Sequence, residues 1–211
     1  MLLEYWNATP VASIIFVFTL VTSIYAFNNT DLFGKFMLHP YSVSKGKNLY
    51  TFITSGLIHA DWMHLFFNMF TFFFFAFKLE RMIGHWQFGL LYIVALILSD
   101  IPTAIRHRDD YRYSSLGASG AISGVLFSYI LFKPTDLIGV MFIPMPAIVF
   151  GVLYLVYCMY MSKNSRDSIN HDAHFFGALT GLVFTVIFVP NIIPNFIAEL
   201  TQGIQYLTGG R

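Results

Sequence analysis

The chain has 211 residues, of which 56% are hydrophobic and only 11% are charged, and 24 of them are phenylalanine. Soluble domains carry about 25% charged residues, so this composition excludes an ordinary water-soluble domain and indicates a membrane protein. A formal net charge of +1, with no long basic run, gives no footprint for a nucleic-acid partner. The single cysteine, Cys158, excludes an intramolecular disulfide.

Six apolar stretches approach the roughly 20 residues that a membrane-spanning helix needs. We expect helices over residues 10–27, 56–77, 86–104, 118–132, 146–161 and 173–189. The first stretch lacks a basic leader and a small-residue cleavage site, so we expect a retained helix there. The sequence therefore predicts an all-α, polytopic membrane domain over residues 1–190, with six membrane-spanning helices.

Two other segments carry expectations of their own. Residues 191–211 follow the last predicted span and have apolar residues at roughly helical spacing, so we expect a short interfacial or flexible tail. Residues 162–172 are polar and join the fifth and sixth predicted helices. We expect them to cover the end of the bundle at which the second, fourth and sixth predicted helices begin.

Polar side chains inside apolar stretches are costly and are therefore candidates for function. Five of them lie in the first half or close to the middle of an even-numbered predicted helix: His59, His64, Asn68, Ser119 and His174. The second, fourth and sixth helices of a six-helix chain run in the same direction. These side chains are therefore expected near one face of the membrane, at comparable depth.

Small residues recur at a spacing of four in two of these helices: Gly120 and Gly124, then Gly177 and Gly181. Such faces let membrane helices pack backbone to backbone. Gly177 and Gly181 share a helix face with His174, so packing of the two glycine faces would bring Ser119 within reach of His174.

A serine hydroxyl is a weak nucleophile until a base removes its proton, and His174 is the candidate base for Ser119. Asp172 lies two residues from His174 and would project elsewhere on a helix, while Asp100 is near the end of an odd-numbered helix. We therefore expect a serine–histidine dyad without a carboxylate.

An oxyanion formed at this serine would need hydrogen-bond donors. His64 and Asn68 are four residues apart and share a helix face, so both could donate, together with the backbone N–H of Ser119. His59 would point to another face and is expected to brace the neighbouring loop.

Three motifs in this order make the sequence resemble the rhomboid family of intramembrane serine proteases. They are H-A-D-W-M-H-L-F-F-N at 59–68, G-A-S-G at 117–120, and A-H-F-F-G at 173–177 followed by Gly181. The resemblance covers roughly residues 8–190, and Leu79-Glu80-Arg81 resembles a short acidic–basic element of the family.

The resemblance implies a nucleophile, Ser119, and a general base, His174. It also implies an oxyanion hole lined by His64, Asn68 and the backbone of Ala118 and Ser119. The glycines that would pack helices around the site are Gly117, Gly120, Gly124, Gly177 and Gly181. No metal or organic cofactor is implied, and the expected partners are transmembrane protein substrates within a lipid bilayer.

Two of the chain's departures from the family pattern concern the site and its orientation. Some members carry an aromatic residue four positions after the nucleophile, packed on the catalytic histidine, where this chain has Ser123. The family orientation, in a bacterial cytoplasmic membrane with the active site toward the outer face, would leave four Lys and Arg residues inside and eight outside. That distribution opposes the positive-inside rule.

Two other interpretations of the same residues remain open. A metal or haem site could be built from His59, His64, His171 and His174, but it would leave Ser119, Asn68 and the glycine spacing without a role. A catalytically silent protein of the same fold could bind membrane helices without cutting them. Such proteins normally lack the serine or the histidine, and this chain has both.

Overall fold

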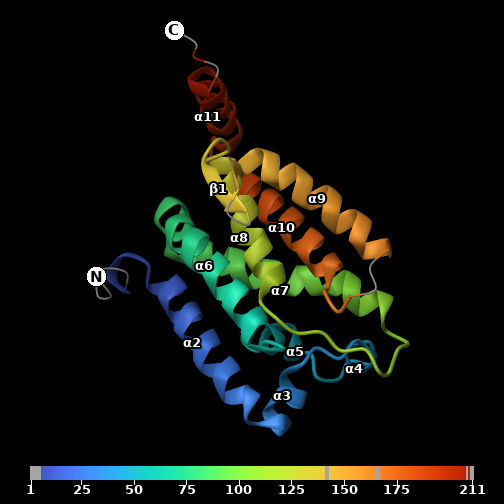
Figure 1. Ribbon diagram of the computed structural model, residues 1–211. Coiled ribbons are helices and arrows are strands. Elements are labelled where there is room, and N and C mark those ends of the chain that lie inside the picture. The colour runs from blue at the N-terminus through green and yellow to red at the C-terminus, as the bar shows by residue number, and fades with distance from the viewer. Residues whose placement is uncertain (1–5, 141–142, 165–166, 208, 210–211) are drawn as a thin grey trace.

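The computed structural model describes residues 6–140, 143–164, 167–207 and 209 (Figure 1). The helices are α2 (Pro10–Phe27), α3 (Thr30–Phe36), α4 (Pro40–Val43), α5 (Thr51–Thr54), α6 (Trp62–Ile83), α7 (His85–Arg106), α8 (Ser119–Phe132), α9 (Ala147–Asn164), α10 (His171–Phe188) and α11 (Ile192–Leu207), with a 3-10 turn, η1 (Ser55–Leu57). A small hairpin pairs β1 (Leu137–Val140) antiparallel with β2 (Ile143–Pro146), so that Leu137 faces Pro146.

Five of the described helices are long and apolar enough to cross a membrane: α2, α6, α7, α9 and α10. The prediction of an all-α, polytopic membrane protein is confirmed, although the described residues also contain the β1–β2 hairpin and an isolated antiparallel bridge between Leu38 and Ser115. The fourth predicted span is observed as α8, which has 14 residues and is shorter than the five candidate spans. Residues 165 and 166 of the expected cap, and residues 208 and 210–211 of the expected tail, lie outside the described residues.

The second span is displaced by six residues at both ends: it begins at Trp62 rather than residue 56 and ends at Ile83 rather than residue 77. The chain makes a 3-10 turn over Ser55–Leu57, and Asp61 then caps α6 by accepting a 2.8 Å hydrogen bond from the backbone N–H of His64. The expectation that His59 lies in this helix is therefore wrong, because the cap sets the helix start after it.

Helix α8 is short and lies in the centre of the bundle, against α6, α7, α9 and α10 (Figure 1). Every residue from Gly120 to Leu131 is buried. Its 14 residues rise about 21 Å at 1.5 Å per residue, whereas the hydrocarbon core of a bilayer is about 30 Å thick. At least one end of α8 must therefore lie below the membrane surface.

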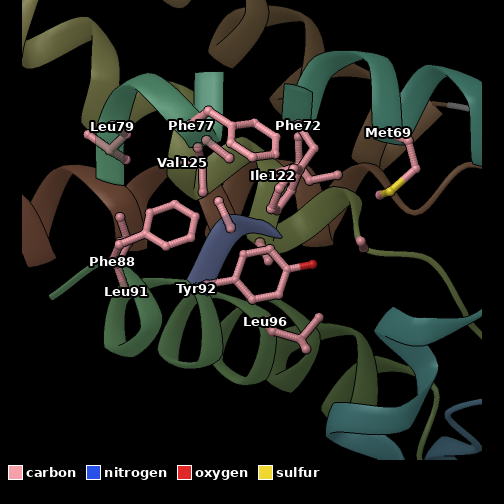
Figure 2. Packing of buried hydrophobic residues seen from close by; sticks show 14 of the residues in the cluster. Met69, Phe72, Phe77, Leu79, Phe88, Leu91, Tyr92, Leu96, Ile122 and Val125 are labelled. Carbon is pink, nitrogen blue, oxygen red and sulfur yellow. The ribbon is translucent and has the colours of Figure 1, made fainter. Parts of the chain in front are cut away.

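Aromatic and aliphatic side chains from α6, α7 and α8 form the core of the bundle (Figure 2). Phe72 is fully buried and meets the ring of Tyr92 edge to face, with centroids 5.8 Å apart. Ile122 and Val125 of α8 fill the same cluster. This packing fixes the N-terminal ends of α6 and α8 relative to each other.

Backbone contact joins α8 to α10. A side-chain carbon built on Gly177 would lie 2.1 Å from the carbonyl oxygen of Gly120, and one on Gly181 would lie 2.1 Å from that of Gly124. The two pairs follow the same order along both helices, so α8 and α10 run parallel. No side chain larger than hydrogen fits at Gly177 or Gly181 without separating the helices.

The C-terminal segment forms a regular helix, α11, at the end of the bundle away from the start of α8 (Figure 1). Ile192 is buried, and Glu199 accepts a 3.0 Å hydrogen bond from Lys133, which follows α8. The tail is therefore attached to the bundle by specific contacts.

Candidate active site

Ser119 is the first residue of α8 and is partly exposed, unlike the buried residues that follow it. The preceding Gly117 has φ +114°, a left-handed conformation that favours glycine. The first backbone N–H groups of a helix have no partner inside it. The serine hydroxyl and the free N–H groups at the start of α8 therefore share one end of a buried helix.

The imidazole of His64 lies directly against Gly117. A side-chain carbon built on Gly117 would be 2.8 Å from Nε2 of His64, so only glycine leaves room for the ring. Nδ1 of His64 accepts a 3.3 Å hydrogen bond from the backbone N–H of Ala60. A neutral ring that accepts at Nδ1 carries its proton on Nε2, so His64 presents an N–H donor to the G-A-S loop.

Asn68 lies one turn after His64 in α6 and is buried. Its Nδ2 donates a 3.0 Å hydrogen bond to the backbone oxygen of His64. One of its two N–H groups is therefore used within its own helix, and the other remains for an oxyanion.

His174 lies in the first turn of α10, partly exposed, and its ring stacks on that of Tyr154 from α9. The centroids are 6.2 Å apart and the rings are inclined by 17°. The hydroxyl groups of Tyr154 and Ser123 are hydrogen-bonded at 2.9 Å. The aromatic partner that Ser123 does not supply is thus supplied by α9, and Ser123 holds it in position.

The contact between α8 and α10 brings the neighbours of Ser119 and His174 together. A side-chain carbon on Gly120, directly after Ser119, would lie 3.3 Å from the carbonyl oxygen of Ala173, directly before His174. Among the described residues, neither the Ser119 hydroxyl nor the His174 ring has a hydrogen-bond partner. Catalytic hydrogen bonds are often long before substrate binds.

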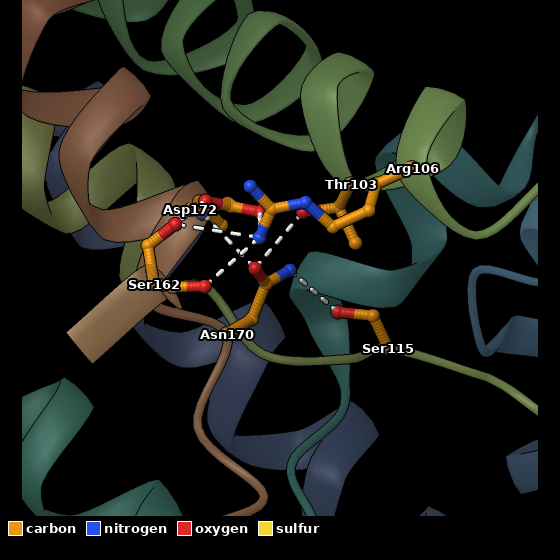
Figure 3. Close-up of polar contacts among 7 residues, drawn as sticks. Thr103, Arg106, Ser115, Ser162, Asn170 and Asp172 are labelled. Carbon is orange, nitrogen blue, oxygen red and sulfur yellow. Dashed lines mark hydrogen bonds and ion pairs between the residues drawn. The ribbon is translucent and has the colours of Figure 1, made fainter. Parts of the chain in front are cut away.

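Asp172 does not orient His174, because it belongs to a separate polar cluster (Figure 3). It pairs with Arg106 of α7 at 2.5 Å and accepts a short hydrogen bond from Ser162 of α9. Asn170 caps α10, accepts from Thr103 at 2.9 Å and donates to Ser115 at 3.1 Å. The cluster ties the ends of α7, α9 and α10 to the loop that leads to Ser119.

His59 braces the loop before α6. Nδ1 of this fully buried ring lies 3.0 Å from the hydroxyl of Ser23 in α2, which also donates to the carbonyl of Leu57. Burial, with a smaller contribution from His64, lowers the pKa of His59 to about 3. The ring is therefore neutral at physiological pH.

The histidines do not gather as the metal interpretation expects. Among the described residues, the one group of potential metal ligands is Cys158, His171 and His174, with one ligand atom of each within 4.8 Å of the others. His59 instead stacks edge to face on His64, with centroids 4.9 Å apart. The proximity of Tyr154 and Cys158 to His174 could not be predicted from the sequence, because it depends on how α9 packs on α10.

The fold and the site define a polytopic membrane protein with a partly exposed serine and a partly exposed histidine at the same end of two parallel helices. The model of the rhomboid domain matches residues 46–191. The chain therefore belongs to the rhomboid family.

Several curated proteins are similar to the chain. "Putative rhomboid protease YdcA" of Bacillus subtilis (strain 168) is 36% identical over 140 residues, which are 65% of this chain and 66% of that protein. "RHOMBOID-like protein 12, mitochondrial" of Arabidopsis thaliana is 26% identical over 173 residues, 74% of this chain and 51% of that protein. The chain thus spans less than two thirds of the length of these relatives.

Proposed function

We propose that this protein is an intramembrane serine endopeptidase, in which Ser119 is the nucleophile and His174 the general base. One observation carries the proposal. The Nε2 atom of His64 lies against Gly117, which is two residues before Ser119. It aims an N–H donor at the helix end that bears an accessible hydroxyl. A structural role alone does not require a donor without a partner at that point.

The proposed reaction proceeds in two halves. Ser119 Oγ attacks the scissile carbonyl while its proton passes to His174, and the resulting oxyanion accepts hydrogen bonds from His64 Nε2–H and the backbone N–H of Ser119. The C–N bond then breaks as His174 protonates the leaving amine. Water attacks the acyl-enzyme in the reverse sequence and releases Ser119.

The location of the site suits peptide bonds close to the membrane surface. Helix α8 is too short to cross the hydrocarbon core, and both Ser119 and His174 keep partial exposure at the same end of the bundle. Backbone carbonyls in a transmembrane helix are hydrogen-bonded internally. We therefore propose transmembrane proteins that unwind near this end as substrates.

Labelling by a fluorophosphonate probe tests the proposal. Native protein in liposomes should be labelled, and both Ser119→Ala and His174→Ala should abolish labelling. Ser114→Ala removes an exposed serine from the same loop and serves as the matched control. If well-folded native protein is not labelled, the protease proposal fails and the helix-binding interpretation gains support.

We further propose that the active site faces outward from a bacterial cytoplasmic membrane. The exposed Tyr111 lies in the loop that leads to Ser119, and the native Cys158 is buried. In intact cells, Tyr111→Cys should react with a membrane-impermeant maleimide, whereas the native chain should not. Reaction only after cell lysis would reverse the orientation, in agreement with the lysine and arginine distribution.

A further inference from the structure

A thiol and two imidazoles gather beside the proposed base. Cys158 of α9 lies near His171 and His174 of α10, and one ligand atom from each falls within 4.8 Å of the other two. Cys158 is fully buried and His171 is 3% exposed, whereas His174 is partly exposed. An ion could therefore reach this cluster past His174, from the side on which Ser119 lies.

His171 is already arranged as a metal ligand would be. Its Nε2 lies 3.3 Å from the carboxylate of Asp167, and its buried Nδ1 has no hydrogen-bond partner among the described residues. A ring that donates Nε2–H to Asp167 presents an unshared pair at Nδ1. Metal-bound histidines usually donate their other N–H to a carboxylate in this way, and a bound cation would satisfy the orphaned atom.

The donor set selects a class of metal. One thiolate and two imidazoles suit zinc and similar divalent transition metals rather than magnesium or calcium, which prefer oxygen ligands. Tetrahedral bonds of about 2.0–2.3 Å keep ligand atoms roughly 3.3–3.8 Å apart. The present separations, up to 4.8 Å, exceed that range by about 1 Å, so binding would draw the three side chains together and leave a fourth position for water.

We propose that Cys158, His171 and His174 bind a zinc-class divalent ion that inhibits the enzyme. On binding, the Cys158 thiol releases its proton to solvent and the thiolate bonds to the metal, while His174 gives the metal the electron pair that would accept the proton of Ser119. The inhibition rests on the proposed function, because it acts through the proposed base.

Cobalt(II) binding to the purified protein in detergent tests the site without any assay of proteolysis. A thiolate-to-cobalt absorption band must come from Cys158, because the chain has one cysteine. We expect about one cobalt per chain with this band, its loss in Cys158→Ser, and at least about 10-fold weaker binding in His171→Gln and Asp167→Asn. His107→Gln, in the loop after α7, is the matched control and should bind like the native protein.

Zinc inhibition is measured in the same variants as the ratio of fluorophosphonate labelling with and without metal. We expect zinc to suppress labelling of the native protein and to have at least about 10-fold lower potency in His171→Gln. Circular dichroism and gel filtration check that each variant is folded. A cobalt band without labelling under any condition would keep the metal site and reject the protease. Labelling without a cobalt band, or zinc inhibition unchanged in Cys158→Ser and His171→Gln, would overturn the metal site.

Discussion

The two ends of α6 both carry polar side chains inside the bundle, but they use them differently. Near the C-terminal end, the carboxylate of the fully buried Glu80 accepts hydrogen bonds from the backbone N–H groups of Val11 and Ala12 at 3.1 and 2.7 Å. It also lies 2.7 Å from Nδ1 of His85. Both carboxylate oxygens are therefore engaged, and they cap the N-terminus of α2.

Near the N-terminal end of α6, hydrogen-bonding capacity is left open. His64 accepts at Nδ1 but has no acceptor for Nε2–H among the described residues, and the hydroxyl of Ser119 is also without a partner there. Burial of a polar residue in a membrane protein thus does not by itself indicate function. A satisfied group holds helices together, whereas an accessible, unsatisfied group is available to a substrate.

The largest expected effect comes from Ser119→Ala, which removes the proposed nucleophile but no described hydrogen bond. Proteolysis of a reconstituted transmembrane substrate should fall by at least about 10⁴-fold, as for other serine nucleophiles. The midpoint of thermal unfolding should stay close to that of the native protein, because Ser119 supports no other group. A loss of stability as large as the one expected for Glu80→Gln would contradict the distinction between the two ends of α6.

His64→Ala should reduce kcat by about 10²–10³-fold, the usual cost of losing one oxyanion donor. KM should change little, since the donor acts mainly on the transition state. Asn68→Ala is the comparison variant, because part of its amide is used by its own helix. Steady-state kinetics in liposomes measure both, and a larger kcat loss in Asn68→Ala would reverse the roles assigned to these side chains.

Glu80→Gln should show the opposite pattern from Ser119→Ala. One carboxylate oxygen becomes an amide N–H that faces donors, so the free energy of unfolding should drop by about 1–3 kcal/mol. Turnover per folded molecule should stay the same, because Glu80 lies at the other end of α6 from His64. Unfolding in mixed micelles gives the first quantity and active-site labelling normalises the second.

Tyr154 should behave as a positioning residue for His174. Tyr154→Leu removes the stacked ring and should lower kcat by about 10-fold, within the range expected for misplaced catalytic groups. Tyr154→Phe keeps the ring, loses the hydrogen bonds of the hydroxyl to Ser123 and Cys158, and should retain most of the rate. The pH dependence of kcat is the informative readout, because a change in packing alone would not shift its acidic limb.

Much of the fold follows from the sequence, because the bilayer demands long apolar helices and glycine spacing marks where they meet. The predicted spans and the observed helices agree within a few residues at most ends. The start of α6 was wrong because the apolar run at 56–60 is folded into a 3-10 turn and an extended segment, which hydropathy does not distinguish from a helix.

The candidate site was predictable only where its residues share a helix or a motif. His64 and Asn68 follow helical spacing, and Ser119 and His174 follow the glycines. Tyr154 and Cys158 reach His174 and His171 across helices, and no period in the sequence encodes those contacts. Asp167 is only four residues before His171, but it lies outside α10, so helical spacing does not predict their contact. The sequence shows that position 123 is a serine and not an aromatic residue. Only the structure shows that Tyr154 of α9 stacks on His174 instead.

The effect that is smallest near neutral pH, and that grows on acidification, concerns His59. Its pKa is lowered from 6.5 to about 3 in the folded protein by burial, so between these values the unfolded chain binds more protons. Stability should therefore fall as the pH is lowered from about 6.5 toward 3. His59→Gln keeps a polar side chain that cannot titrate, and the slope of unfolding midpoint against pH should become shallower. An unchanged slope would mean that other titratable groups determine how stability depends on pH. His59 would then support the contact between α2 and the loop before α6 without contributing to that dependence.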